Sequence, residues 1–280
     1  MDNKPISSKN ILISMILATH NEQEHISNCI NSLLTQSYPQ VEIIITDDGS
    51  VDKTVEIITK LKKKNKNIKL VKQNHLGMAQ AWNNSFKHSK GNIAIMFGAD
   101  MVAGKDFIKE LVRPIIEEGA LGSRPIKEKI QNANNLWARV KGKERIYSDT
   151  TYLAIRRDAW IKVGGADITR GYDADQSFYD ALKIKPKKVR VEIYHYHPAS
   201  FNEFWKQSIW IGRSMTIENK VLFFLALPFI PLIIIYKSIK TFIEDPYPPF
   251  IIFLPFYNIL KYIAFLIGNI SYIVFKKRKR

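Results

Sequence analysis

The sequence has a single cysteine, Cys29, among its 280 residues. One cysteine excludes an internal disulfide framework and any zinc site built on cysteines. Cys29 lies in an apolar pattern of helical spacing, so we expect it to be a small core residue. The fold must therefore be held together without covalent cross-links.

Two glycine-rich nucleotide motifs are also missing. No G-x-G-x-x-G follows the first apolar run, which disfavours a nicotinamide-dependent enzyme. The segment GSVDKT lacks the glycine-lysine pair of the phosphate loop, which disfavours a nucleoside triphosphatase. The N-terminal MDNKPISSKN has no apolar h-region, so we expect no secretory signal peptide and a cytoplasmic location for this part of the chain.

Acidic residues are scarce: 26 stand against 42 lysines and arginines, a formal net charge of +16. Such a charge favours anionic partners, namely nucleic acid, phosphorylated ligands or the cytoplasmic leaflet of a membrane. The lysine runs LKKKNKNIK and KKRKR lack interleaved aromatic residues, which disfavours nucleic acid. Phosphorylated ligands and a membrane remain.

Strand-like and helix-like segments alternate along the first two hundred residues. Apolar runs typical of strands occupy residues 11–17, 41–46, 68–73 and 92–97. Helical periodicity marks residues 22–36, 52–64 and 77–87. A further strand and a short helix are expected in 151–165, ending at Gly164 and Gly165. This alternation predicts an α/β fold with a mostly parallel sheet flanked by helices.

Polar residues gather where the predicted strands end. ATHNEQEH follows the first strand, TDDGSVDKT the second and GADM the fourth. Right-handed crossovers place the carboxyl ends of parallel strands on one edge, where ligands bind in open sheets. Asp100 of GADM is thus a candidate ligand, and a turn or helix cap is the alternative. Ser50 or Asp52 can also cap the helix that follows.

The last 65 residues change character. Val221–Tyr236 has no charged residue and spans about 24 Å as a helix, less than the roughly 30 Å of a hydrocarbon core unless flanking lysines snorkel. The second apolar stretch, Phe250–Phe275, is long enough but contains Lys261. We predict two membrane spans, near 220–242 and 250–275.

Two alternatives to spanning helices stay open. Pro228 and Pro231 interrupt the first apolar stretch, which favours interfacial helices lying in the headgroup region. A soluble hairpin packed on a core is the other alternative. If the chain spans the membrane, KKRKR belongs on the cytoplasmic side together with the N-terminal domain.

The chain resembles family 2 of the nucleotide-sugar glycosyltransferases, which have the GT-A fold, a Rossmann-like sheet. The resemblance covers roughly residues 10 to 215. It rests on ILATHNEQEHISNCINSLLTQSYPQVEIIITDDGSVDKT, the Gly-Ala-Asp after the fourth strand, AIRRDAWIKVGGAD and GYDADQSF. It implies a GT-A domain at 1–215 and a membrane-associated helical segment with a basic tail at 216–280.

The resemblance implies a donor site on the first two strands. Asp48 matches the carboxylate that accepts a hydrogen bond from the nucleobase, and Asp47 orders the turn. In relatives, residues after the first strand cradle the base and ribose; here they are Thr19, Asn21 and Glu22. The other reading of DDGS is an Asx turn with Gly49 at a positive φ. Trp82, on a helix that approaches the nucleotide in the family, is expected to pack rather than to bind.

A divalent metal, Mn²⁺ or Mg²⁺, is also implied, because a departing diphosphate carries negative charge that a Lewis acid neutralises. Asp100 matches the family's direct metal ligand. Gly98 replaces the first acid of the usual Asp-X-Asp, which weakens metal and ribose contacts. His195 and His197 alternate along a strand and share one face. His197 is the stronger candidate ligand of the two, and packed strand residues are the alternative.

GYDADQSF resembles the family's acceptor motif, with Tyr172 in place of the usual Glu. Asp173 matches the base that takes the proton from the attacking hydroxyl. Asp175 is expected to orient or cap the helix. The acceptor-side element of the family maps onto Gln207, Trp210 and Arg213, and Arg213 can pair with phosphate.

The expected function is inverting transfer of a sugar from a UDP- or GDP-linked donor to a hydroxyl of a lipid-linked or cell-surface glycan at the cytoplasmic membrane face. A synthase that charges polyprenyl phosphate is the first alternative, although an anionic nucleophile needs no base. A non-catalytic membrane protein that kept the fold is the second, suggested by Gly98 and Tyr172.

Overall fold

A computed structural model describes residues 6, 11–143, 148–214 and 217–275, and gives only the backbone for 171–172, 217–220 and 273–275. The chain divides into two compact units. The sheet unit comprises Met1–Gln131, Arg145–Thr169 and Asp173–Tyr196. The helical unit comprises Asn132–Glu144, Arg170–Tyr172 and His197–Arg280. The domain boundary at residue 215 stays a prediction, and KKRKR lies outside the described residues.

Seven strands of the sheet unit form one sheet in the order β3-β2-β1-β4-β8-β6-β9. Their bounds are β1 Ile13–Thr19, β2 Val41–Asp47, β3 Ile68–Lys72, β4 Ile93–Gly98, β6 Gly122–Pro125, β8 Ala154–Arg156 and β9 Lys187–Val189. Strands β3, β2, β1 and β4 are parallel, and β8 alone runs against its neighbours β4 and β6. The predicted mostly parallel sheet is confirmed. Its chain order reverses between β1 and β4, where ligands bind in such sheets.

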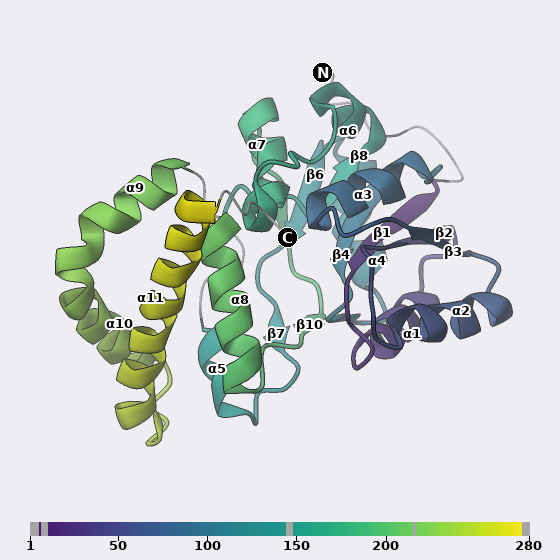
Figure 1. Cartoon of the computed structure of the whole chain (residues 1–280). Helices are drawn as coiled ribbons and strands as arrows, with labels where there is room; N and C mark the ends of the chain where they lie inside the picture. The colour runs from purple at the N-terminus through teal and green to yellow at the C-terminus, as the bar shows by residue number, and fades with distance from the viewer. Residues whose placement is uncertain (1–5, 7–10, 144–147, 215–216, 276–280) are drawn as a thin grey trace. The chain divides into compact units, whose positions relative to one another are not determined.

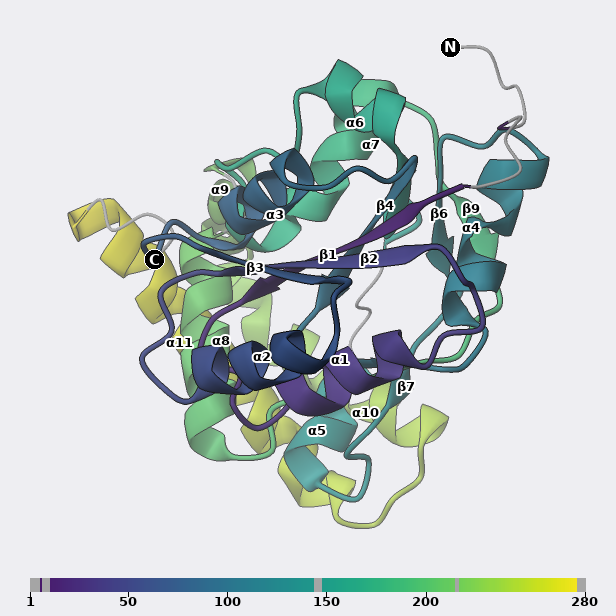
Figure 2. The ribbon, with the colours of Figure 1, turned by 90° about the vertical axis from the view of Figure 1, so that its right-hand side faces the viewer.

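Helices cover both faces of this sheet. They are α1 Ile26–Leu34, α2 Thr54–Lys64, α3 Met78–Lys87, α4 Phe107–Glu117, α6 Arg157–Val163 and α7 Ser177–Leu182. Figure 2 shows α1 and α2 on one side of β1 and β2, and α3, α6 and α7 on the other. Strand β1 alternates between the two cores: Met15 and Leu17 pack with Cys29 of α1, whereas Ile16 packs with Trp82 of α3. Cys29 is thus a buried core residue, as predicted.

Two predicted boundaries were wrong by a few residues. The first strand continues to Thr19, so Thr19 lies within the strand and not after it. The first helix begins at Ile26 and not at residue 22, because the amide of His25 bonds to the carbonyl of Glu22 in a preceding turn. Helix α6 ends as predicted at Gly164, whose φ of 83° suits glycine.

A smaller three-stranded sheet lies beyond β4. Its strands are β5 Met101–Ala103, β7 Lys129–Ile130 and β10 Ile193–His195. The central strand β10 is antiparallel to β5 and parallel to β7. Ala99 and Asp100 separate β4 from β5, so two residues stand between the two sheets. Residues 125–147, predicted as an irregular loop with helical stretches, contribute β7 to this sheet and a short helix, α5 (Leu136–Lys141), to the helical unit.

The helical unit consists of helices that surround α11. They are α5 Leu136–Lys141, α8 Phe201–Ser214, α9 Ile217–Ala226, η2 Leu227–Phe229, α10 Ile230–Glu244 and α11 Phe250–Phe275. Figure 1 shows α8 beside α11, where Gly212 and Gly268 allow close approach of the two backbones. The segments Val221–Glu244 and Phe250–Tyr272 are long and apolar enough to cross a membrane, by length and composition.

Candidate active site

Asp100 lies at the carboxyl end of β4, on the edge where ligands were expected. Its Oδ2 is 2.9 Å from Nε2 of His195, at the end of β10. Its backbone carbonyl accepts a hydrogen bond of 2.9 Å from the amide of Tyr196. The predicted acid and a predicted histidine, 95 residues apart in the chain, therefore meet in the sheet unit.

A second acid lies on the other side of the same imidazole. Nδ1 of His195 is 3.0 Å from Oε1 of Glu128, which precedes β7. The side chains of Glu128 and His195 are only 6% and 15% exposed. Burial lowers the pKa of His195, but Asp100 and Glu128 outweigh it and raise that pKa to about 10. The imidazole therefore carries a proton at neutral pH, between two carboxylates.

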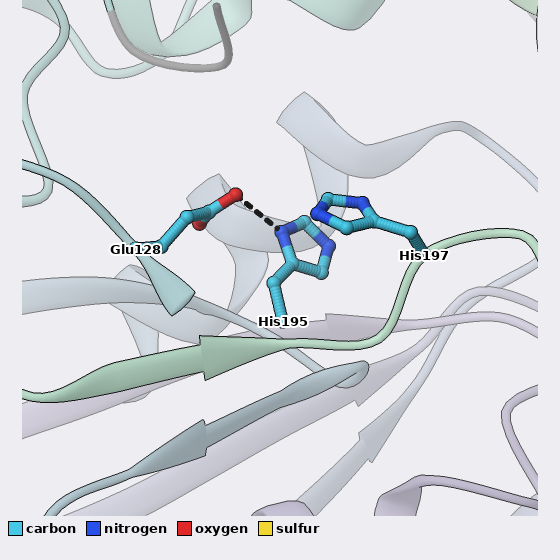
Figure 3. A group of neighbouring side chains, drawn as sticks. All are labelled: Glu128, His195 and His197. Carbon is cyan, nitrogen blue, oxygen red and sulfur yellow. Dashed lines mark hydrogen bonds and ion pairs between the residues drawn. The ribbon is translucent and has the colours of Figure 1, made fainter. Parts of the chain in front are cut away.

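Figure 3 shows the carboxylate of Glu128 directed at His195. His197 belongs to the helical unit, where Asn132 bonds to its amide and its carbonyl. A role of His197 at the metal stays a prediction. Carboxylate oxygen and imidazole nitrogen suit Mn²⁺.

Sequence reasoning missed Glu128. The residue stands in a polar stretch that predicts no regular structure, and no spacing relates it to Asp100 or His195. It reaches the site because β7 pairs with β10, matching Ile130 to His195. Only that long-range pairing reveals it.

A third carboxyl group, that of Glu22, feels the charge of Asp100. Burial, and then the negative charge of Asp100, raise the pKa of Glu22 to about 8. The backbone amide of Glu22 donates to Oγ1 of Thr54 over 2.8 Å. The loop after β1 thus brings the acid Glu22 towards Asp100. A hydrogen bond holds this loop to Thr54, which follows the β2 turn.

Asn21 fastens the same two loops. Its amide donates to Oγ of Ser50 over 2.9 Å, and its Oδ1 accepts from the amide of Val51 over 2.9 Å. Its φ of 56° places it in the left-handed region, which asparagine tolerates better than most residues. The side chain predicted to contact the donor therefore shapes the loop.

Asp48 is buried, with 3% of its surface exposed. Its Oδ1 accepts from Nε2 of Gln73 and from the amide of Leu76, both at 2.7 Å, and its Oδ2 accepts from the amide of Gly77 at 2.9 Å. The carboxylate thereby joins the turn after β2 to the segment between β3 and α3. Gly49 has the positive φ, 80°, that the Asx-turn reading requires. Contact of Asp48 with a nucleobase stays a prediction.

Thr19 and Asp47 face each other across β1 and β2 as register partners. Both are 3% exposed. Oδ2 of Asp47 accepts from the amide of Ser50. Among the described residues, Oγ1 of Thr19 and Oδ1 of Asp47 have no hydrogen-bond partner. Buried polar atoms of this kind are rare in folded proteins, and a ligand is one means of satisfying them.

Asp173 lies in η1 (Gly171–Gln176), a 3₁₀ helix that is kinked at this residue. Burial, and then the charge of Asp173, raise the pKa of the neighbouring Asp175 to about 7. Two acids of the predicted acceptor motif therefore influence each other. The side chain of Tyr172 lies outside the described residues.

Helix α3 holds the segment that precedes this motif. Asn83 donates to the carbonyl of Ala166 and accepts from its amide, each over 2.8 Å. Trp82 is 7% exposed and packs in the core, in line with the packing role expected from the sequence.

Gly98, the departure from Asp-X-Asp, has a steric consequence. A Cβ atom at this position would lie 2.5 Å from Oδ1 of Asp100. With the arrangement seen here, in which Asp100 meets His195, only glycine fits without a shift of the acid.

The three acceptor-side candidates lie on α8 in the helical unit. They are Gln207, Trp210 and Arg213. Nε of Arg213 donates to Oγ of Ser271 on α11 over 2.9 Å. Arg213 therefore joins two helices of its own unit, and a role at the acceptor stays a prediction.

Known proteins resemble the chain in sequence and fold. It is 37% identical over 101 residues to a dolichyl N-acetyl-alpha-D-glucosaminyl phosphate 3-beta-D-2,3-diacetamido-2,3-dideoxy-beta-D-glucuronosyltransferase of Methanococcus voltae, a match that covers 35% of this chain and 32% of the relative. It is 29% identical over 129 residues to a poly-beta-1,6-N-acetyl-D-glucosamine synthase of Staphylococcus aureus, covering 46% and 31%. The chain spans about a third of the length of these two relatives.

A solved structure shares the fold. A mannosyltransferase from Pyrobaculum calidifontis, in complex with GDP-Man and Mn²⁺, matches with a TM-score of 0.64 and 13% identity, over 98% of this chain and 90% of that one. The predicted GT-A architecture is thus confirmed. The family model described as glycosyl transferase family 2 matches residues 14–176, more than half of the sequence. The chain belongs to glycosyl transferase family 2.

Proposed function

We propose that this protein transfers a sugar, with inversion, from a UDP- or GDP-linked donor to a hydroxyl of a lipid-linked or cell-surface glycan. The observation that carries the proposal is the row Asp100, His195, Glu128 at the carboxyl end of β4, in a chain of this family. Two carboxylates around one imidazole in a partly buried place form a site for positive charge.

The donor atoms of this site fit a divalent metal, Mn²⁺ or Mg²⁺, and the imidazoles favour Mn²⁺. Asp100 and His195 would hold the ion, and Glu128 would orient the imidazole through its other nitrogen. His197 stays the further ligand predicted from the sequence. When bound, the ion neutralises the charge that develops on the leaving diphosphate. In the metal-free protein the protonated His195 supplies the positive charge at this place, and its proton would be released when an ion binds.

The donor nucleoside binds where the loops after β1 and β2 are joined. Oγ1 of Thr19 and Oδ1 of Asp47 support this, because each is buried and lacks a partner within the described residues. Asn21 and Glu22 shape the same loops, and Asp48 orders the turn beside them. These contacts prepare a rigid surface, which reduces the entropy lost when a nucleotide binds.

Asp173 takes the proton from the attacking hydroxyl. The pKa of its neighbour Asp175 is raised to about 7 by burial and then by the charge of Asp173, so below that pH Asp175 adds no second negative charge beside the base. Tyr172 and the α8 residues Gln207, Trp210 and Arg213 bind the acceptor. The printed name of the archaeal relative describes transfer to a lipid-linked sugar, which supports this acceptor class. A base-bearing motif favours it over charging of a polyprenyl phosphate.

The reaction takes place at the cytoplasmic face of the cell membrane. Two apolar segments support attachment, and the basic tail of the sequence supports this orientation. A cysteine-reactive, membrane-impermeant reagent tests it: a cysteine placed at Ser7 reacts only after cells are opened. Labelling of this cysteine in intact cells would show that the N-terminal domain lies outside the cell and would contradict the proposed orientation.

The first test measures Mn²⁺-dependent release of nucleoside diphosphate from a panel of UDP- and GDP-sugars, with the full chain in detergent. We expect release from one donor, and at least a hundredfold loss in Asp100→Asn, because a metal ligand is removed. Asp106→Asn is the matched control, since Asp106 is an exposed acid of the same unit that bonds to Ser37. If no donor is cleaved and calorimetry detects no nucleotide binding, the non-catalytic alternative replaces this proposal.

A further inference from the structure

Helix α1 and its N-cap residue His25 carry a polar stripe that faces the smaller sheet. His25, Asn28 and Ser32 recur at intervals of three and four residues, so they lie along one side of the helix. Oγ of Ser32 accepts from the amide of Ala103 in β5 over 3.0 Å. Asn28 and His25 both contact Tyr196, the residue after β10. The stripe therefore contacts β5, which follows Asp100, and Tyr196, which follows His195.

Tyr196 is held on three sides. Its amide donates to the carbonyl of Asp100 over 2.9 Å. Its ring stacks on that of His25, with centroids 4.4 Å apart and planes inclined by 16°. Its hydroxyl oxygen accepts from Nδ2 of Asn28 over 3.3 Å. One side chain thus connects α1 to the backbone of the metal-site acid.

The segment that carries His195 needs such an anchor. Strand β10 has three residues, β5 has three and β7 has two, so the ladder around His195 is short. His195 is the last paired residue, matched to Met101 of β5. Short ladders of this size are marginal by themselves. The stack of Tyr196 on His25 adds a contact at the residue that follows His195, where this short ladder ends.

We propose that His25, Asn28 and Tyr196 are positioning residues for the metal site: they hold Asp100 and His195, whose Oδ2 and Nε2 atoms lie 2.9 Å apart, in place for a divalent cation. This inference rests on the proposed function. Outer contacts that orient metal ligands are worth about tenfold to a hundredfold in metal affinity.

The test titrates Mn²⁺ into the full chain in detergent and follows free Mn²⁺ by electron paramagnetic resonance. Tyr196→Leu, which loses the stack and the hydroxyl, is expected to weaken Mn²⁺ binding about tenfold. Tyr196→Phe keeps the ring, and Asn28→Ala removes only the amide, so each is expected to lose about threefold. The Mn²⁺ affinity of His25→Phe, which preserves the stack, is expected to stay within twofold of that of the unmodified chain. His25→Ala loses the stack, so its Mn²⁺ affinity is expected to fall by more than twofold.

A matched control and a second readout separate positioning from general destabilisation. Tyr38→Phe removes a tyrosine hydroxyl that bonds to the carbonyl of Ile11, away from the stripe, and should leave Mn²⁺ binding unchanged. Nucleoside diphosphate binding in EDTA should be the same in all variants.

The outcomes are distinct. Unchanged Mn²⁺ affinity in Tyr196→Leu, with loss in Asp100→Asn, overturns this inference and leaves the proposed function standing. Absence of Mn²⁺ binding by the unmodified chain overturns both. Parallel loss of Mn²⁺ and metal-free nucleotide binding in Tyr196→Leu assigns Tyr196 to stability and also overturns the inference.

Discussion

The loops after β1 and β2 and the acids around His195 share one edge of the sheet, but their polar groups are satisfied in opposite ways. In the loops, Asn21 and Asp48 bond to backbone amides and shape the chain. Around His195, the acids Asp100 and Glu128 contact a single proton-bearing ring. The loops are ordered by their own hydrogen bonds, whereas the acids depend on a positive charge held between them.

The loops therefore give this edge of the sheet its shape, whereas the acids around His195 supply its chemistry. A change in the loops should affect folding and nucleotide binding, because it leaves amides without acceptors. A change among the acids should affect metal binding and turnover and leave folding nearly intact. Four substitutions test this contrast, in order of expected effect.

Asp173→Asn tests the base. We expect transfer to a lipid extract containing the acceptor to fall by about 10² to 10⁴, because the asparagine cannot accept the hydroxyl proton. Nucleoside diphosphate binding should stay within twofold. Asp180→Asn, at a further acid on α7, is the control. Normal transfer by Asp173→Asn would show that Asp173 is not the catalytic base.

Asp48→Asn tests the loops. Its amide group would meet the donors of Gln73, Leu76 and Gly77, one of which loses its acceptor. We expect the free energy of unfolding of the sheet unit to fall by about 2 kcal/mol. Thermal melting of the full chain in detergent measures it, with the surface variant Asp158→Asn for comparison. A melting temperature equal to that of the unmodified chain would show that the bonds to Asp48 are replaceable.

Gly98→Ala tests whether metal binding depends on the contact between Asp100 and His195. The added Cβ would lie 2.5 Å from Oδ1 of Asp100, so the acid must rotate away from His195. We expect Mn²⁺ affinity to drop about tenfold, with little change in the melting temperature. If Mn²⁺ binds as before, the contact between Asp100 and His195 is not part of the metal site.

Asp175→Asn should have the smallest effect on transfer and metal binding, and an effect on stability that depends on pH. The pKa of Asp175 rises from its usual value near 3.8 to about 7 in the folded chain, first because it is buried and then because Asp173 is near. The folded state therefore binds more protons than the unfolded state between these values, and stability falls as the pH rises from about 4 to 7. Asp175→Asn should remove this part of the fall.

Melting temperatures at pH 5 and pH 8 check this expectation. The unmodified chain should lose more stability between the two than Asp175→Asn does. Glu22 and His195, whose pKa values are also raised, contribute falls of the same sign that persist in the variant. Equal pH dependence in both proteins would contradict the raised pKa of Asp175.

Local pattern was enough to predict much of the sheet unit. Alternating apolar runs and helical periodicity depend on contacts between near neighbours in the chain, so β1 to β4 and α1 to α3 could be placed within a few residues. Asp100 could be singled out because a buried strand ends beside it. The ends of these elements were less certain: the turn before α1 is held by a bond from His25 to Glu22, which no periodicity indicates.

Spacing along the chain is sufficient to assign the class of fold, the family and the acids at the ends of the strands. The position of His195 between Asp100 and Glu128, and the stacking of Tyr196 on His25, depend on how distant parts of the chain pack together. Those contacts join residues 67 to 171 positions apart through strand pairing, where each partner is specified by the packing of the whole sheet and by no local pattern.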